Sequence, residues 1–218
     1  MSRRHASISK NNMFSGIVET EAKIVSVDME GKCKRVRIQK PRGWKLDLGE
    51  SISVDGICST IASTGQNYFE VEYMPQTLSK TTAALFEKGA ILNLEHSLKY
   101  GDRIHGHFVA GHVDIRARVV GIEKDGRSRL VRVQLPRTLS RYVVSHGSIA
   151  VNGVSLTVAR KSDTSFTVAL IPHTLKATNL ANLKTGDAVN IECDVLARYG
   201  LAAPRRSARV RTHAKRRS

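Results

Sequence analysis

The stretch VDGICST (residues 54–60) returns 97 residues later as VNGVSLT (residues 151–157). Three further matches keep the same order: MPQTL (74–78) with IPHTL (171–175) at an offset of 97, and GIVE (16–19) with GHVD (111–114) and VRIQ (36–39) with VRVQ (131–134) at an offset of 95. Matches in one order at nearly one spacing indicate a tandem duplication. Such a period is too long for a solenoid unit, so each copy is expected to form a small domain.

Each copy carries the pattern of short β-strands. Apolar residues alternate with polar or small ones at 36–38, 131–135 and 166–170, and turn signals such as Glu30-Gly31 and Asp125-Gly126 recur between them. Evenly spaced short strands predict a closed or nearly closed antiparallel barrel in each copy, which also removes exposed sheet edges. Helix is expected only at 137–146, between Pro136 and Gly147, and as a short segment at 195–201.

Length and composition exclude several classes of protein. The chain has 218 residues, of which 41% are hydrophobic and 25% charged, as in an ordinary globular protein. No apolar run approaches the roughly 18–20 residues that cross a bilayer, and the N-terminus lacks the apolar core of a secretory signal. Cys33, Cys58 and Cys193 are an odd number of isolated cysteines, which argues against disulfides and a cysteine-built zinc site. These features predict a cytoplasmic protein.

The net charge of +16 suggests nucleic acid as a partner, but its placement weakens that interpretation. Residues 1–12 hold three basic residues and no acid, and residues 198–218 hold eight and no acid, which leaves +5 for the rest. Aromatic residues make up only 5% of the chain, so the barrels lack the stacking platforms of single-strand binders. A nucleic-acid-binding function is therefore the third hypothesis, and solvated basic tails are the simpler account.

The residues also resemble a known family. MFSGIVE (13–19), both copies of the VDGICST motif, both Pro-x-Thr-Leu motifs and AGHV (110–113) are similar to the riboflavin synthase alpha-chain family, over residues 13 to about 199. The resemblance implies an all-β fold of two tandem six-stranded Greek-key barrels with short helices and a short C-terminal helix. It implies a transferase that dismutates two molecules of 6,7-dimethyl-8-ribityllumazine to riboflavin and 5-amino-6-ribitylaminouracil, without metal or cofactor. It further implies a homotrimer with active sites between subunits, and it allows an association with lumazine synthase.

This division of the chain gives four expected segments. Residues 1–12 are a basic N-terminal extension, 13–107 the first lumazine-binding barrel, and 108–196 the second. Residues 197–218 are expected to form a short helix followed by a basic, disordered tail. Pro204 and the arginines after it depart from the family's longer C-terminal helix.

The resemblance assigns substrate-binding residues to each barrel by motif. For the first barrel they are Gly16, Ile17, Val18, Cys58, Ser59, Thr60, Glu72, Tyr73, Met74, Pro75, Gln76 and Thr77. For the second barrel they are Gly111, His112, Val113, Ser155, Leu156, Thr157, Ala169, Leu170, Ile171, Pro172, His173 and Thr174, with His146 and Asp194 added. Amides and hydroxyls in such segments suit a heteroaromatic ring with a polyhydroxy chain. Without the resemblance, turn glycines and strand threonines explain the same residues.

The resemblance also implies four candidate catalytic residues, Ser51, Cys58, His112 and Thr157, which match positions of the family's catalytic region. Ser51 and Cys58 offer a nucleophile or a proton relay, although a buried cysteine is often inert packing. His112 suits proton transfer, with Thr157 as its expected partner in the same barrel. Because Ser155 takes the place of Cys58 in the second copy, the two sites differ chemically.

Other features favour alternative interpretations. His105, His107 and His112 resemble a metal-binding pattern, but no acidic or cysteine ligand completes it locally, so no metal site is predicted. Ser59, Asp55, His105 and His146 depart from the family's usual residues. Ser59 and His146 are the features that fit the runner-up hypothesis, a non-catalytic lumazine- or flavin-binding protein of the same fold.

Overall fold

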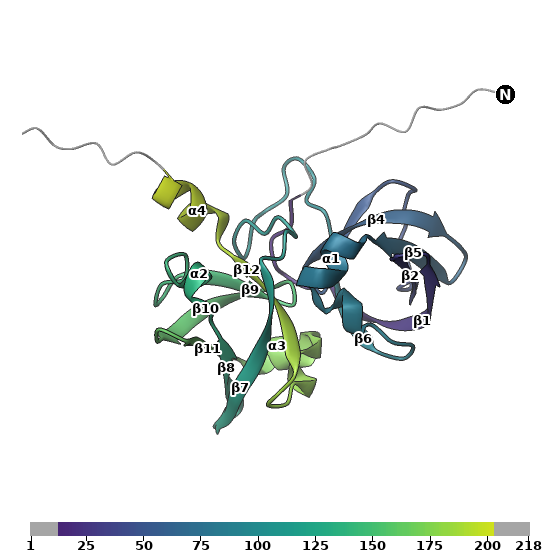
Figure 1. The fold of residues 1–218 in the computed structure, drawn as a ribbon. Coiled ribbons are helices and arrows are strands. Elements are labelled where there is room, and N and C mark those ends of the chain that lie inside the picture. The colour runs from purple at the N-terminus through teal and green to yellow at the C-terminus, as the bar shows by residue number, and fades with distance from the viewer. Residues whose placement is uncertain (1–12, 203–218) are drawn as a thin grey trace, which may run out of the picture.

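The computed structural model describes residues 13–202, which form two closed six-stranded antiparallel barrels (Figure 1). The first barrel contains β1 (Thr20–Glu30), β2 (Cys33–Gln39), β3 (Ser51–Val54), β4 (Ile57–Thr64), β5 (Tyr68–Tyr73) and β6 (Ile91–His96). Around this barrel the strands run in the order β1-β2-β5-β4-β3-β6. The order follows the chain only in part, so the barrel is closed by crossovers between strands.

The second barrel repeats the first one strand for strand. It contains β7 (Ile115–Asp125), β8 (Ser128–Gln134), β9 (Ser148–Val151), β10 (Val154–Lys161), β11 (Ser165–Leu170) and β12 (Ala188–Cys193). The strand order β7-β8-β11-β10-β9-β12 is that of the first barrel with six added to each label. The duplicated all-β fold predicted from the sequence is confirmed.

Alternating side chains form a separate core in each barrel. On β2, Val36 and Ile38 are fully buried while Arg37 between them lies on the outer surface. Val131 and Val133 on β8 repeat this arrangement. Since strand side chains point alternately to opposite faces, one apolar set in each strand fills the barrel and the polar set faces outward.

The helices are short and cap the barrels. α1 (Pro75–Lys80) and α3 (Pro172–Ala177) each have a proline in the first turn and lead into the 3₁₀ turns η1 (Thr82–Leu85) and η2 (Asn179–Asn182). These four elements follow β5 and β11, where the sequence analysis expected only substrate-binding segments. α4 (Val195–Ala202) confirms the helix expected at 195–201.

The helix expected at 137–146 is much shorter than predicted. α2 covers only Arg137–Ser140, and the following residues form turns in which the N–H of Tyr142 donates to the carbonyl of Leu139. His146 then takes a positive φ of 65°, and its N–H donates to the carbonyl of Val158 in β10. The chain must turn back here to enter β9, so tertiary contacts end the helix before its apolar periodicity does.

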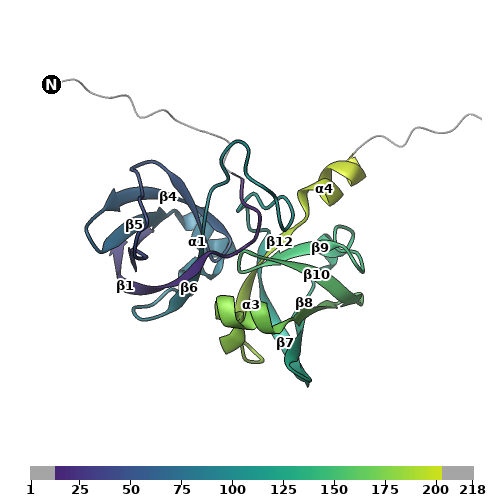
Figure 2. The ribbon, with the colours of Figure 1, turned by 180° about the vertical axis from the view of Figure 1, so that it is seen from behind.

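The two barrels lie side by side, and the segment that joins them runs up and back between them (Figures 1 and 2). α4 follows β12 and projects from the top of the second barrel, pointing away from the first barrel. Residues 1–12 and 203–218, for which a basic extension and a basic tail were expected, lie outside the described residues. In residues 13–202, no helix combines the length and the apolar character needed to cross a membrane.

Buried amides join the barrels at the tips of two equivalent hairpins. The side-chain amide of Asn93 donates to the carbonyl of Asn152, and that of Asn190 donates to the carbonyl of Asp55. Asn179 donates to the Asp55 carboxylate at 2.9 Å. Asp55, Asn93, Asn152 and Asn190 are buried, and Asn179 is half-buried beside them. Because their hydrogen bonds cross from one barrel to the other, the joint has a specific geometry.

Candidate functional site

Two short segments precede the barrels and pair with each other between them. The first leading segment is residues 13–18, ahead of β1, and the second leading segment is residues 107–113, ahead of β7. Phe14 and Val109 form an antiparallel bridge in which each N–H donates to the other's carbonyl, at 2.7 and 3.0 Å. Both side chains are fully buried, so this bridge fixes the two segments against each other.

Each leading segment then lies on the barrel that it does not begin. The N–H of Ser155 in the second barrel donates to the carbonyl of Gly16 at 2.7 Å. The N–H of Cys58 in the first barrel donates to the carbonyl of Gly111 at 2.9 Å. Val18 packs on the core of the second barrel and Val113 on that of the first. The two segments are therefore exchanged between the barrels.

This exchange corrects the grouping made from sequence. The motifs placed Gly16 to Val18 with Cys58 and Gly111 to Val113 with Ser155, whereas the structure joins them the other way round. Gly111, which precedes His112, bonds Cys58 of the first barrel, whereas Thr157, the expected partner of His112, lies on β10 of the second barrel. A repeat comparison aligns equivalent residues within each copy, so it could not reveal an exchange between copies.

Two buried carboxylates anchor the leading segments. Glu95 at the end of β6 accepts the N–H and the hydroxyl of Ser15, both at 2.7 Å, and the N–H of Gly16 at 3.1 Å. Glu192 at the end of β12 accepts the N–H of Ala110 at 2.7 Å. Burial raises the pKa of Glu95, and it raises the pKa of Glu192 to about 7, because a charge is costly away from water.

On the first barrel, three predicted residues lie together on the outer face of β3 and β4. Ser51 is directly opposite Thr60 in the strand pairing, and the Ser51 side chain hydrogen-bonds the Cys58 thiol. Burial raises the pKa of Cys58, since its desolvation outweighs this hydrogen bond. The thiol is therefore protonated at neutral pH and is suited to proton relay rather than to attack as a thiolate.

The second barrel presents the matching set, with one additional residue. Ser148 is opposite Thr157, at the position equivalent to Ser51 opposite Thr60. Ser155 replaces Cys58, and its hydroxyl lies 2.7 Å from Nδ1 of His107. Burial lowers the pKa of His107 although Asp194 acts in the opposite direction, so the imidazole is neutral at pH 7.

His107 and Ser148 are the residues of this site that the sequence analysis missed. His107 was considered only as part of a metal-binding pattern, yet its ring is buried beside Ser155, and its Nε2 has no hydrogen-bond partner in residues 13–202. The offset of 97 that relates the repeats would have found Ser148 from Ser51. The contact between His107 and Ser155 could not be predicted from a sequence pattern, because the two residues are 48 positions apart and only the path of the second leading segment places them together.

Four of the predicted substrate-binding residues point into the barrels. Ser59, Tyr73, Leu156 and Leu170 are buried, and the Ser59 hydroxyl bonds the Tyr73 hydroxyl at 3.0 Å inside the first core. They alternate with residues that face outward, as strand geometry requires. Only their backbone groups are available to a ligand on the outer face.

The remaining predicted residues lie around the two outer faces. Met74 and Ile171, at equivalent positions before α1 and α3, expose 59% and 54% of their surface. Each barrel therefore has an exposed apolar side chain on which the flat ring of a ligand could pack. Glu72 is held in an ion pair with Arg35. The other predicted residues on these segments are partly or fully exposed: Ile17, Pro75, Gln76, Thr77, Ala169, Pro172, His173 and Thr174.

His146 and Asp194 lie at the edges of the second barrel. His146 is exposed in the turn before β9. Asp194 accepts the N–H of Leu196 at the start of α4, where it also faces His107. Among residues 13–202, no group of three or more histidine, cysteine or acidic side chains is placed to hold a metal ion.

Comparison with known proteins agrees with this architecture. Residues 15–97 and 110–194 each match the lumazine binding domain family. The riboflavin synthase of Bacillus amyloliquefaciens is 38% identical over 188 residues, which are 86% of this chain and 87% of that protein. The chain belongs to the riboflavin synthase family. The riboflavin synthases of Actinobacillus pleuropneumoniae and Brucella abortus are 36% and 37% identical, each over 86% of this chain, and over 87% and 96% of their own length.

Solved structures confirm the fold independently. LumP in complex with riboflavin superposes with a TM-score of 0.78 at 24% identity, covering 83% of this chain and 98% of LumP. LumP in complex with 6,7-dimethyl-8-(1'-D-ribityl) lumazine gives a TM-score of 0.75 over 82% of this chain and 98% of LumP. This chain therefore shares its fold, a pair of barrels, with LumP.

Proposed function

We propose that this chain is a riboflavin synthase. It would take two molecules of 6,7-dimethyl-8-ribityllumazine and transfer a four-carbon unit from one to the other, which gives riboflavin and 5-amino-6-ribitylaminouracil. The observation that carries this proposal is the pair of equivalent outer faces, Ser51-Cys58-Thr60 on one barrel and Ser148-Ser155-Thr157 on the other. Two identical substrates need two such faces, and relatives 36–38% identical over most of the chain carry the name of that enzyme.

The differences between the two faces suit a reaction in which two like molecules have unlike roles. The second barrel offers a neutral histidine, His107, bonded to Ser155, and this pair can accept a proton and return it near neutral pH. The first barrel offers the neutral thiol of Cys58 with Ser51. The acidic 7-methyl group of the lumazine supplies much of the reactivity, so the protein needs chiefly to hold two rings and move protons. Holding them can contribute several kcal/mol.

The arrangement of the subunits belongs to the same proposal. A first barrel of one copy and a second barrel of another would face each other in a homotrimer, and the exposed Met74 and Ile171 would be covered by rings or by the neighbouring copy. We place the protein in the cytoplasm, where the three free cysteines fit a reducing compartment. An association with lumazine synthase, which would deliver the substrate, is part of this proposal.

The test is to incubate the purified chain with 6,7-dimethyl-8-ribityllumazine alone and to follow the visible spectrum. Riboflavin and the uracil product in equal amounts, with nothing else added, are the expected result. Lumazine that binds and is never converted would overturn the proposal in favour of the non-catalytic binding protein, a function to which the departures at Ser59 and His146 would then belong.

A further inference from the structure

The outer face of the first barrel carries a row of four residues, one from each of four neighbouring strands. Strand pairing places Ser26, Arg37, Glu70 and Ser63 side by side across β1, β2, β5 and β4. Both Nε and Nη2 of Arg37 bond one oxygen of Glu70, at 2.8 and 2.7 Å, and Ser63 bonds the same carboxylate. This row contains one cation and one anion, so its charge is balanced within the chain.

The equivalent row of the second barrel is positively charged, because it has two arginines and no acidic residue. Gly121, Arg132, Thr167 and Arg160 lie side by side across β7, β8, β11 and β10. Thr167 stands where the first barrel has its glutamate, and Arg160 where it has a serine. Two guanidinium groups therefore flank a hydroxyl, and in residues 13–202 neither takes part in an ion pair.

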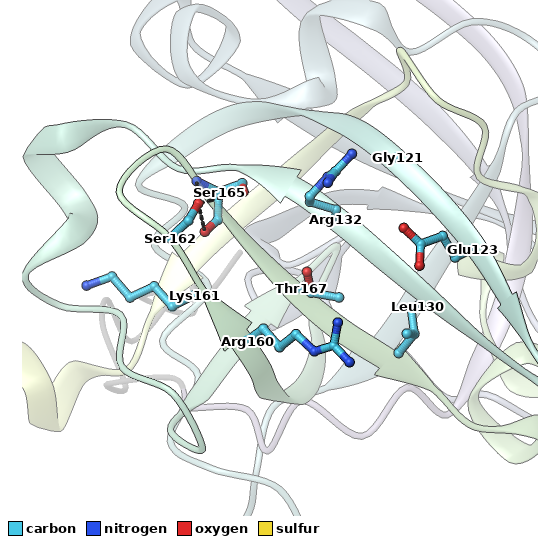
Figure 3. A pocket seen from close by; sticks show the side chains of 9 residues that line it. All are labelled: Gly121, Glu123, Leu130, Arg132, Arg160, Lys161, Ser162, Ser165 and Thr167. Atoms are coloured by element: carbon cyan, nitrogen blue, oxygen red, sulfur yellow. Dashed lines mark hydrogen bonds between the residues drawn. The ribbon is translucent and has the colours of Figure 1, made fainter.

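This row lies in a cavity of about 330 Å³ on the barrel surface (Figure 3). The Arg132 guanidinium lies over Gly121, because a Cβ added to Gly121 would be only 2.9 Å from Nη2 of Arg132. A glycine at this position therefore leaves room for the arginine. Figure 3 shows Arg132 and Arg160 on either side of Thr167, with Glu123 farther along the groove near Leu130. The groove thus has two arginines at its centre and its acidic residue at one end.

We propose that this groove, defined by Arg132, Thr167 and Arg160, binds an oxyanion, and that its ligand is phosphate, either free or as a monoester of a small molecule. The internal repeat indicates what the site lacks, because the first barrel fills the same place with the carboxylate of Glu70. Arginine forks bond the paired oxygens of phosphate, and the Thr167 hydroxyl adds a neutral donor between them. The cavity is large enough for a phosphate or a small ester and does not accommodate a folded element of a partner.

The three residues that define the groove differ from the residues assigned to lumazine. The groove shares β10 and β11 with the lumazine face of the second barrel, but it extends across β8 and β7 instead of β9. The arginines are exposed, so binding is expected to weaken as salt screens them. Failure of either proposal leaves the other standing.

The test uses the full chain and radiolabelled inorganic phosphate in equilibrium dialysis at low salt. Thr167→Glu supplies the carboxylate of the first barrel and is expected to weaken phosphate binding at least tenfold, about 1.4 kcal/mol. Arg160→Ser supplies the first barrel's serine and is expected to weaken it severalfold. Arg42→Ser removes an exposed arginine elsewhere and is the matched control, which should bind as the wild type does.

Competition by phenyl phosphate separates the two sources of the ligand. Displacement of the label by phenyl phosphate more strongly than by unlabelled phosphate would support a monoester, and equal or weaker displacement would support free phosphate. Wild-type chain that shows no saturable binding would overturn the proposal. So would binding that Thr167→Glu and Arg160→Ser leave as strong as in Arg42→Ser, because the phosphate would then lie elsewhere.

Discussion

Gly56 and Gly153 meet back to back where the two barrels join. Each is the second residue of a tight hairpin turn, with φ of 77° and 78°, after Asp55 and Asn152, which also have positive φ. A Cβ on Gly56 would lie 2.6 Å from the backbone nitrogen of Gly153, and a Cβ on Gly153 would lie 2.7 Å from that of Gly56. The duplicated motif therefore needs glycine twice, once for the turn and once for the contact between copies.

We expect Gly56→Ala to destabilise the chain by roughly 3 kcal/mol, because the methyl group meets backbone that cannot move aside and the left-handed conformation adds its own cost. Gly49→Ala is the matched control, since Gly49 has a φ of 80° and nothing within 4 Å of an added Cβ. It should lose only about 1 kcal/mol. Urea unfolding of both variants measures the loss in the free energy of unfolding. Equal losses in the two variants would mean that the contact between the turns does not contribute to stability.

Asp55→Asn should remove a pH dependence of stability. The Asp55 carboxylate accepts the N–H of Asn93 and the amide of Asn179, and burial raises its pKa to about 7. The unfolded chain releases this proton near pH 4, so the wild-type free energy of unfolding falls as the pH rises from about 4 to 7. The Oδ1 of an asparagine can accept both of these bonds, and Asn152 at the equivalent position of the second copy accepts the N–H of Asn190 in the same way as Asp55 accepts that of Asn93.

The advantage of Asp55→Asn over the wild type should therefore grow by roughly 2 kcal/mol between pH 5 and pH 8. Unfolding by urea at several pH values measures it. Asp163→Asn, at an exposed position, is the control and should show no such growth. An advantage of Asp55→Asn that stays constant with pH would contradict the prediction.

The sequence was enough to predict the barrels because their determinants are local and occur twice. Alternation at 36–38 and 131–135 follows directly from strands that have one face in a core. The helix at 137–146 was wrong because its apolar spacing was read without the turn at His146, which a bond to Val158 in another strand imposes. The prolines that begin α1 and α3 were visible signals that went unused.

The candidate site was predicted only in part, for a related reason. Cys58 and Thr60 lie together because they are two residues apart on one β-strand, where alternate side chains point to the same face. The exchange of the segments at Gly16 and Gly111 between the barrels depends on contacts between residues about 50 to 140 positions apart in sequence. Alternation of apolar and polar residues along one strand does not predict such contacts.

Cys58→Ser should keep most of the proposed activity, and Cys58→Ala should lose most of it. Burial raises the pKa of Cys58, so at neutral pH the group is a thiol that can relay a proton, and the Ser155 hydroxyl stands in its place in the second copy. We expect Cys58→Ser to form riboflavin at a rate within about fivefold of the wild type and Cys58→Ala to be at least tenfold slower. If serine is as damaging as alanine, a thiolate nucleophile is required and the relay is wrong.

His107→Ala and Ser155→Ala should each slow riboflavin formation by about tenfold to a hundredfold, the usual contribution of a positioned proton-transfer group. Nδ1 of His107 lies 2.7 Å from the Ser155 hydroxyl, so the two groups can pass a proton between them, and removing either one breaks the pair. His105→Ala is the matched control, since His105 is two residues away and exposed. It should retain the wild-type rate.

The pH profile separates a proton-transfer role for His107 from a structural one. Burial holds the pKa of His107 below 6.5, so the neutral, active form is lost only as the pH falls through that lower value. The wild-type rate should therefore decline on the acid side, and this decline should be absent from the residual activity of His107→Ala. A variant that is slower but keeps the same acid limb would show that His107 only supports the fold around Ser155, and that another group exchanges the proton.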